Sequence, residues 1–134
     1  MKQISIFIEN EKGKLAEVSA LLAENGVNLR ALSIADTADY GILRIVADDA
    51  EKAHAILSEN GYLTKISEVV GVKIQDKHGS LARIITALSN AGISVEYAYA
   101  FTSAEPGTAF MAFRVNDNKL AVDALSNVGI SANI

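Results

Sequence analysis

Two short stretches decide how this chain is organised: Glu11-Lys12-Gly13-Lys14-Leu15-Ala16 and Lys77-His78-Gly79-Ser80-Leu81-Ala82. Their glycines, Gly13 and Gly79, stand 66 positions apart. The same offset aligns further residues: Ile8 with Ile74, Leu22 with Leu88, and Gly26 with Gly92. Self-similarity at a fixed spacing is the sequence signature of a repeated structural unit.

The repeat continues towards the end of the chain with a small change in spacing. The offset becomes 68 for the pairs Leu57 with Leu125, Ser58 with Ser126, and Gly61 with Gly129. The extra residues fall near Ser103-Ala104-Glu105-Pro106-Gly107, which holds the only proline, and loops accept insertions readily. We therefore predict two copies of one unit as domains, at residues 1–67 and 68–134.

Each copy begins with a strand and a helix. Period-two alternation predicts strands around Ile4, Ile6 and Ile8, and around Val70, Val72 and Ile74. Helical spacing then marks apolar faces at Leu15, Val18 and Leu22, and at Leu81, Ile84 and Leu88. Gly26 and Gly92 follow, where a left-handed residue is expected to end a helix.

Each copy continues with two strands, a helix and a last strand. The predicted strands are 27–36 and 40–47 in the first copy, and 93–103 and 107–115 in the second. Turns are expected at Asp39-Tyr40-Gly41 and Glu105-Pro106-Gly107. The second helices begin near Asp48 and Asn116, bury Ala53, Ile56, Leu57, Ala121, Ala124 and Leu125, and end at Gly61 and Gly129. The last strands are 62–68 and 130–134.

The order βαββαβ, found twice, predicts an α+β fold of two tandem ferredoxin-like units. Each would be an antiparallel sheet with both helices on one face. One unit of this size would bury only about 60% of its unfolded surface, which makes it marginal alone. We therefore expect the two units to pack together.

Composition excludes several classes of protein. Twelve basic and sixteen acidic side chains give a net charge of −4, which disfavours broad binding to a phosphate backbone. The absence of cysteine removes disulfides, thiolate zinc sites and cysteine nucleophiles. Charged residues interrupt every apolar stretch before the roughly 18 residues of a membrane span. We expect a cytoplasmic protein without a cofactor.

The turn into the first helix carries the most polar cluster of each copy, Asn10-Glu11-Lys12-Gly13 and Asp76-Lys77-His78-Gly79. A helix start offers unpaired N–H groups and a positive dipole end, which suit a carboxylate. Asn28 opens the next strand and would reach the same pocket, or its equivalent across an interface. The alternative is that the glycines only make tight turns while Asn and Asp satisfy local backbone groups.

The pattern strand, Asn/Asp-x-x-Gly-x-Leu, amphipathic helix, Gly-[Val/Ile]-Asn-Leu resembles an ACT domain over essentially the whole chain. The first copy ends Gly26-Val27-Asn28-Leu29 and the second Gly92-Ile93-Ser94-Val95. The resemblance implies a sensor of free amino acids that binds its ligand at interfaces between domains. The family often has proline before the glycine, where this chain has Lys12 and His78.

The resemblance implies ligand-binding residues in both copies. The candidates are Asn10, Glu11, Lys12, Gly13, Leu15 and Asn28 in the first copy, and Asp76, His78, Gly79, Ser80, Leu81 and Ser94 in the second. Since Ser94 replaces asparagine, we expect the first copy to match an amino-acid site better.

Enzymatic and metal chemistry find little support. Asp76, His78 and Ser80 alternate on one stretch, so their side chains would not converge as in a serine hydrolase. His54 is expected to be a solvated residue of a helix face. Two histidines do not supply a metal cluster.

RNA recognition is a further alternative, because RNA-recognition modules share the βαββαβ order and stack bases on strand aromatics. Tyr97, Tyr99 and Phe101 alternate on one predicted strand, and Phe110 and Phe113 lie on the next. No basic residues interleave with them. We therefore expect these rings to pack in the core or to cover a partner.

We conclude from the sequence that the chain is a non-enzymatic amino-acid sensor, expected to be a homodimer that acts on a metabolic enzyme or regulator. Neither nucleic acid nor membrane is an expected partner. Two alternatives remain. Glu9-Asn10-Glu11-x-Gly-x-Leu resembles the opening of the small subunit of acetohydroxyacid synthase, which implies a regulatory subunit. The other alternative is a small ferredoxin-like enzyme.

Overall fold

The computed structural model describes residues 1–9, 11–36, 40–102 and 105–133. It divides into two compact units, which we call the N-terminal unit (residues 2–67) and the C-terminal unit (Met1 with residues 68–134). Met1 groups with the second unit because its carbonyl accepts a hydrogen bond from the N–H of Val69 at 2.9 Å. The division into separate domains at 67/68 stays a prediction.

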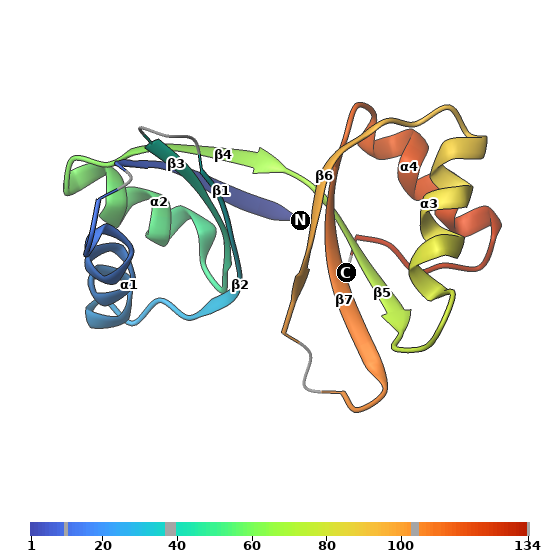
Figure 1. Cartoon of the computed structure of the whole chain (residues 1–134), viewed down its shortest axis with the longest axis horizontal. Helices are drawn as coiled ribbons and strands as arrows, with labels where there is room; N and C mark the ends of the chain where they lie inside the picture. The colour runs from blue at the N-terminus through green and yellow to red at the C-terminus, as the bar shows by residue number, and fades with distance from the viewer. Residues whose placement is uncertain (10, 37–39, 103–104, 134) are drawn as a thin grey trace. The chain divides into compact units, whose positions relative to one another are not determined.

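The N-terminal unit is a four-stranded sheet with two helices on one face (Figure 1). Its elements are β1 (Lys2–Glu9), α1 (Lys14–Glu24), β2 (Leu29–Asp36), β3 (Tyr40–Ala47), α2 (Ala50–Glu59) and β4 (Leu63–Glu68). The strand order is β2-β3-β1-β4, and β3 runs antiparallel to both β1 and β2. This is the predicted ferredoxin-like βαββαβ arrangement.

The C-terminal unit repeats this arrangement with a shorter end (Figure 1). Its elements are β5 (Val70–Gln75), α3 (Ser80–Asn90), β6 (Val95–Phe101), β7 (Thr108–Val115) and α4 (Asn118–Asn127). The sheet order is β5-β7-β6. A last strand was predicted over 130–134; in the described part of this range, residues 130–133, the pairing is one bridge, in which Ala132 lies opposite Val72.

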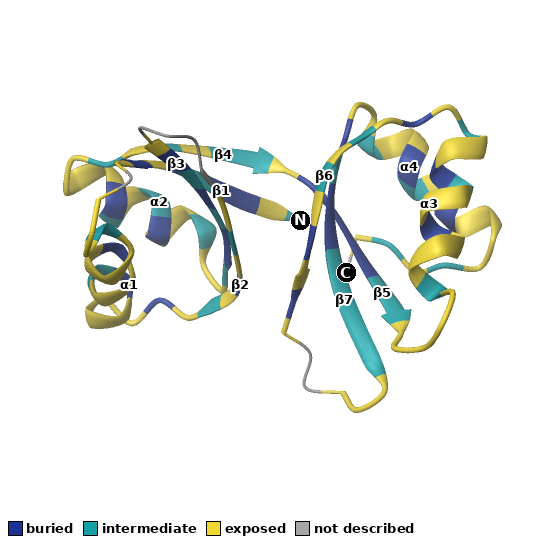
Figure 2. Cartoon of the chain, in the orientation of Figure 1, coloured by how far each residue is buried: buried dark blue, intermediate teal, exposed yellow. Residues whose placement is uncertain are grey.

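Each unit has its own apolar core between the sheet and the helices, drawn dark blue in Figure 2. In the N-terminal unit the alternating residues of β1 meet α1 and α2: Ile4, Ile6, Ile8, Val18, Leu22, Ala53 and Leu57 are all buried. In the C-terminal unit the equivalent set is Val70, Val72, Ile84, Leu88, Ala121 and Leu125. The period-two and helical patterns therefore predicted both cores correctly.

Leu15 and Leu81 are exceptions to the predicted helix faces. They are 37% and 45% exposed, whereas the residues one turn later, Val18 and Ile84, are buried. Because both leucines lie in the first turn of a helix, they project beyond the sheet that covers the following turns. Two apolar side chains are thus exposed beside the polar corners that the sequence singles out.

The helix ends confirm the role of the glycines. Asn25 caps the end of α1 and Gly26 follows at φ 70°, and the other three helices are likewise followed by a glycine at positive φ. Only glycine adopts this conformation without strain. The turn 105–107 is confirmed as well, since the N–H of Thr108 donates to the carbonyl of Glu105 at 3.2 Å.

The predicted helix starts were wrong by one residue. Asp49 caps α2 by accepting from the N–H of Lys52 at 3.0 Å, and Asp117 caps α4 in the same way. Asp48 instead accepts from the N–H of Asn28 at 3.1 Å. Both adjacent residues offer a carboxylate that could cap the helix. Asp49 has the extended backbone that is typical of an N-cap residue, with φ −131°.

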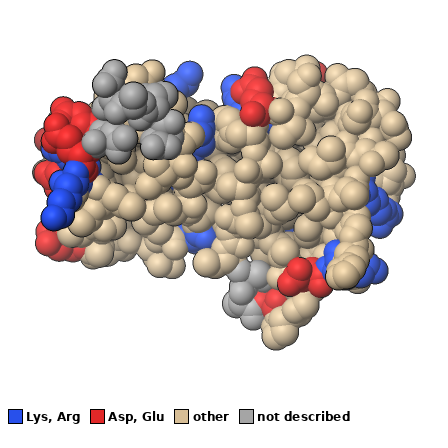
Figure 3. Space-filling model, viewed as in Figure 1, with Lys and Arg blue, Asp and Glu red and all other residues tan. Residues whose placement is uncertain are grey.

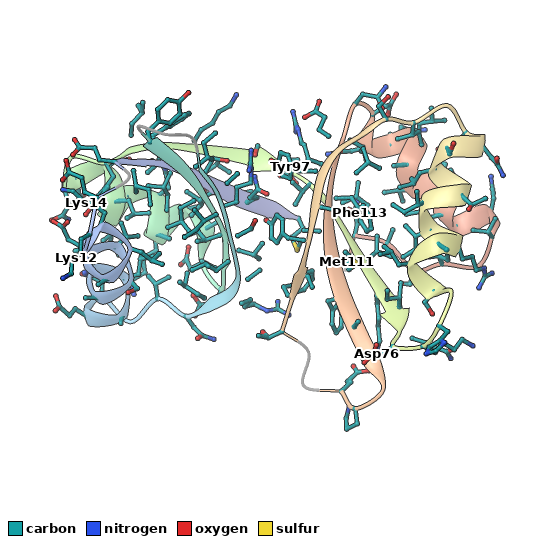
Figure 4. All side chains as sticks on the ribbon, viewed as in Figure 1. Lys12, Lys14, Asp76, Tyr97, Met111 and Phe113 are labelled. Carbon is teal, nitrogen blue, oxygen red and sulfur yellow. The ribbon has the colours of Figure 1, made fainter. Side chains whose placement is uncertain are left out.

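The aromatic residues of the C-terminal unit divide between the two faces of its sheet. Phe113 is fully buried against α3 and α4. This ring therefore packs in the core, which is one of the two placements that the sequence predicted. Tyr97 lies on the other face, away from the helices (Figure 4), where its ring stacks 6.5 Å from that of Tyr99. Phe101 and Phe110 form a second pair, with ring centroids 5.3 Å apart. These four rings lie outside the core cluster.

Candidate functional site

Gly13 and Gly79 occupy equivalent corners, each directly before the first helix of its unit. Their φ angles are +90° and +84°, in the left-handed region that favours glycine. A Cβ at either position would meet no atom within 4 Å. The requirement for glycine at both corners is therefore conformational, and open space adjoins the backbone.

The backbone of both corners follows the same hydrogen-bond pattern. In the N-terminal corner the N–H of Glu11 donates to Glu9 at 2.8 Å, and that of Lys14 donates to Glu11 at 3.3 Å. In the C-terminal corner Lys77 donates to Gln75 at 2.9 Å and Ser80 to Lys77 at 3.3 Å. The first N–H groups of any helix lack a carbonyl partner within that helix. They can therefore donate hydrogen bonds to an anion.

The structure does not bring Asn28 to the Gly13 corner of the same unit. Gly13 follows Glu9, which pairs with Tyr40 at one end of β3, whereas Asn28 precedes Leu29, which pairs with the other end. These ends are separated by the eight residues of β3, a length of about 25 Å. Ser94 precedes β6 in the same way, and its N–H donates to Asn116. A pocket completed across an interface stays a prediction.

The N-terminal corner is dense in charge (Figures 3 and 4). The ammonium of Lys14 lies 3.6 Å from the carboxylate of Glu17. This carboxylate raises the pKa of Lys14 most strongly, with further contributions from Glu9 and Glu11. The pKa of Tyr62 is raised as well, first by burial and then by the charge of Glu17. Glu11 and Lys12 are exposed, and Asn10 lies outside the described residues.

The C-terminal corner opens into a cavity of about 690 Å³. Three of the predicted binding residues line this cavity, His78, Gly79 and Ser80. Their neighbour Lys77 lines it as well. The strand, helix, hairpin and chain end around them contribute the remaining walls: Lys73, Ile74, Gln75, Arg83, Glu105, Thr108, Gly129, Ile130 and Ser131. Leu81 and Asp76 flank this set, and Figure 4 shows Asp76 beside the β6–β7 hairpin. The N–H of Asp76 donates to Gly107 at 2.9 Å.

The sequence-based reasoning missed several walls of this cavity. Arg83 lies one turn after Gly79 on α3, so helical spacing alone would have found it. Lys73 lies two residues before the end of β5, and its ammonium is 2.6 Å from the Glu105 carboxylate. The local signals at Gly129 and over 130–134 predicted a helix end and a strand but not a place at this corner, because only the tertiary fold brings Gly129, Ile130 and Ser131 there.

Among the described residues no group of three or more His, Asp or Glu side chains is placed to hold a metal ion. His54 was expected to be solvated, but it is half-buried and its Nδ1 lies 2.6 Å from the hydroxyl of Thr64 on β4. In the part of the chain that the structure describes, no helix is long and apolar enough to cross a membrane.

Comparison with known proteins identifies the family. A family model described as an ACT domain pair matches residues 1–133. The chain belongs to the ACT domain pair family. Its structure is similar to that of protein BT0572 from Bacteroides thetaiotaomicron, at 36% identity and a TM-score of 0.91, covering 98% of this chain and 90% of that one.

Two solved structures share the ACT pair fold at lower identity. They are the ligand-free regulatory subunit of aspartate kinase from Thermus thermophilus (17% identity, TM-score 0.69, 94% of this chain and 91% of that one) and the regulatory subunit of aspartate kinase from Thermus flavus (19%, 0.63, 96% and 92%). No protein with a curated description matches this chain. The ACT domain pair is a regulatory fold, and both units contribute to it.

Proposed function

We propose that this ACT domain pair is a non-enzymatic sensor that binds a free amino acid at its glycine corners. The observation that carries the proposal is the cavity of about 690 Å³ at the Gly79 corner, within the range of small-molecule sites. Gly79, directly before α3, lines this cavity, and the N–H groups and positive dipole end of a helix start suit a carboxylate. Ser80 and Ser131 add hydroxyl groups to its walls.

The proposal includes a homodimer in which residues 1–67 and 68–134 act as two domains. In the N-terminal unit, β2 and β4 are the edges of the sheet, and edge strands present unpaired backbone groups to a partner. A pairing of this kind would let Asn28 of one unit complete the Gly13 corner of another. Sedimentation equilibrium with and without ligand measures this association. A chain that stays monomeric in both conditions contradicts it.

Ligand binding becomes regulation only through a partner that distinguishes the free and bound states. We propose that this partner is a metabolic enzyme or regulator in the cytoplasm. Co-purification of a catalytic subunit with the tagged chain would instead support the regulatory-subunit alternative. Turnover by the purified chain alone would support the small-enzyme alternative.

A thermal-shift panel of the twenty amino acids on the full chain tests the sensor function. A ligand at 100 times its dissociation constant adds about 2.7 kcal/mol to the stability of the state that binds it. We expect one or two amino acids to raise the melting temperature by several degrees. A flat panel contradicts the proposal.

A matched pair of glycine variants locates the site. Gly79→Ala and Gly92→Ala both force a Cβ onto a left-handed backbone, and neither Cβ meets an atom within 4 Å. Both should lower the melting temperature of the free protein to a similar extent. Only Gly79→Ala should weaken the ligand-induced shift, because Gly92 lies at the far end of α3. Equal ligand shifts in the two variants would place the site elsewhere.

A further inference from the structure

The cavity of the C-terminal unit is lined by more cations than anions. Lys73, Lys77 and Arg83 contribute positive charges, and Glu105 contributes a negative one. The Lys73 ammonium lies 2.6 Å from the Glu105 carboxylate, so these two charges largely offset each other. Lys77 and Arg83 remain, and with the flanking carboxylate of Asp76 they leave the corner an excess of one positive charge.

Arg83 is held in place by the fold. Its guanidinium donates a hydrogen bond to the backbone carbonyl of Val128, directly before the chain end that forms the opposite wall. One such bond uses one of the five N–H donors of a guanidinium. The planar guanidinium can donate two parallel hydrogen bonds to a carboxylate, which the ammonium of lysine cannot do. Arg83 is thus an exposed cation beside the start of α3, with one hydrogen bond to the backbone of its unit.

The positive character is specific to this corner. At the repeat offset, Lys77 corresponds to Glu11 and Arg83 corresponds to Glu17, so both cations stand where the N-terminal unit has acids. The chain as a whole carries a net charge of −4, which makes a locally positive cavity unusual on its surface.

We propose that the cavity of the C-terminal unit binds an acidic amino acid, a ligand with two carboxylates and one ammonium. One carboxylate meets the start of α3 at Gly79 and Ser80, and the second meets Lys77 and Arg83. The ammonium is accommodated by the Glu105 carboxylate. This assignment rests on the proposed sensor function and adds the ligand class to it.

Isothermal titration calorimetry of the full chain tests the ligand class with four probes. L-glutamate and L-aspartate are compared with L-glutamine and L-asparagine, which have the same shape without the second charge. A charge-assisted pair is roughly twice as strong as a neutral one, so we expect the better acid to bind at least about tenfold more tightly than its amide. Its affinity should also fall with added salt.

Three variants place the second carboxylate. Arg83→Gln should weaken binding of the acid about tenfold or more while leaving the affinity for the amide nearly unchanged. Lys77→Gln, whose side chain is exposed, should act in the same direction and serves as a second test should Arg83→Gln fail to fold. Lys119→Gln is the matched control, because Lys119 lies in the same unit but outside the cavity, and its side chain is 90% exposed. It should leave both affinities unchanged.

The outcomes separate the two proposals. Preferential binding of a neutral or basic amino acid, or acid binding that is indifferent to both Lys77→Gln and Arg83→Gln, overturns the ligand class and leaves the sensor function standing. Absence of binding by all twenty amino acids overturns both. Succinate or inorganic phosphate binding as tightly as the amino acid would show a general anion site and overturn the assignment of the ammonium.

Discussion

The two glycine corners share a backbone and differ in what surrounds it. Gly13 and Gly79 adopt the same left-handed conformation, and their loops form the same hydrogen bonds. Where the C-terminal cavity is lined by Ser80, Arg83 and Ile130, the N-terminal corner has Lys14, Glu17 and Tyr62. All three exchanges change size, charge or both.

This comparison shows that the repeat preserves the backbone conformation of the corner but not the side chains that surround it. In the N-terminal corner, Lys14 and Glu17 satisfy each other at 3.6 Å, and the large side chain of Tyr62 stands in the position of Ile130. In the C-terminal corner the smaller Ser80 and Ile130 line the cavity, and Arg83 has no carboxylate one turn back to pair with. Two ACT units of one chain thus present chemically distinct corners.

The largest expected effect comes from the cores. Phe113 and Ile45 occupy equivalent positions, opposite the first strand of each unit, and both are fully buried. Phe113→Ala should cost about 3–5 kcal/mol and Ile45→Ala about 2–5 kcal/mol, because each leaves a cavity in a packed core. Urea unfolding measures both.

This pair of variants also tests the domain boundary. If residues 1–67 and 68–134 unfold as separate domains, each substitution should shift only one of two transitions. A single transition that both substitutions shift equally would contradict independent domains and indicate one cooperative structure.

A smaller effect is expected at the helix caps. Asp49→Ala and Asp117→Ala each remove the side chain that accepts from the third residue of a helix, at a cost of about 1 kcal/mol. Thermal unfolding should show similar losses in both units. Asn116→Ala is the comparison, because its side chain accepts from Ser94 and not from α4. If Asn116→Ala weakens α4 more than Asp117→Ala does, the cap is misassigned.

The smallest effect concerns Tyr62, whose counterpart in the C-terminal corner is the non-titratable Ile130. Its raised pKa favours the neutral phenol in the folded state, so its contribution to stability is present below pH 10.0 and is lost as the pH rises through the folded-state pKa. Glu17→Gln should lower the pKa of Tyr62 while leaving the effect of burial. An NMR titration of the Tyr62 ring measures it. An unchanged pKa would show that the Glu17 charge does not reach the hydroxyl.

The sequence by itself determined the duplicated βαββαβ order, the four glycines that follow the helices and the residues of both cores. Each of these depends on local conformation or on short periodicity, which neighbours along the chain record. The caps of α2 and α4 were predicted wrongly at Asp48 and Asn116, because adjacent residues both offer an acceptor and the sequence does not show which one meets the first turn of the helix.

Only the tertiary structure decided what each corner contains. It exposed Leu15 and Leu81 beyond the sheet, and it placed Asn28 at the far end of its unit from Gly13. It also brought Ile130 from the chain end to the Gly79 corner, a proximity that no local pattern encodes. A cavity gathers residues that are distant in sequence, so its shape and charge depend on packing and become visible only once the chain has folded.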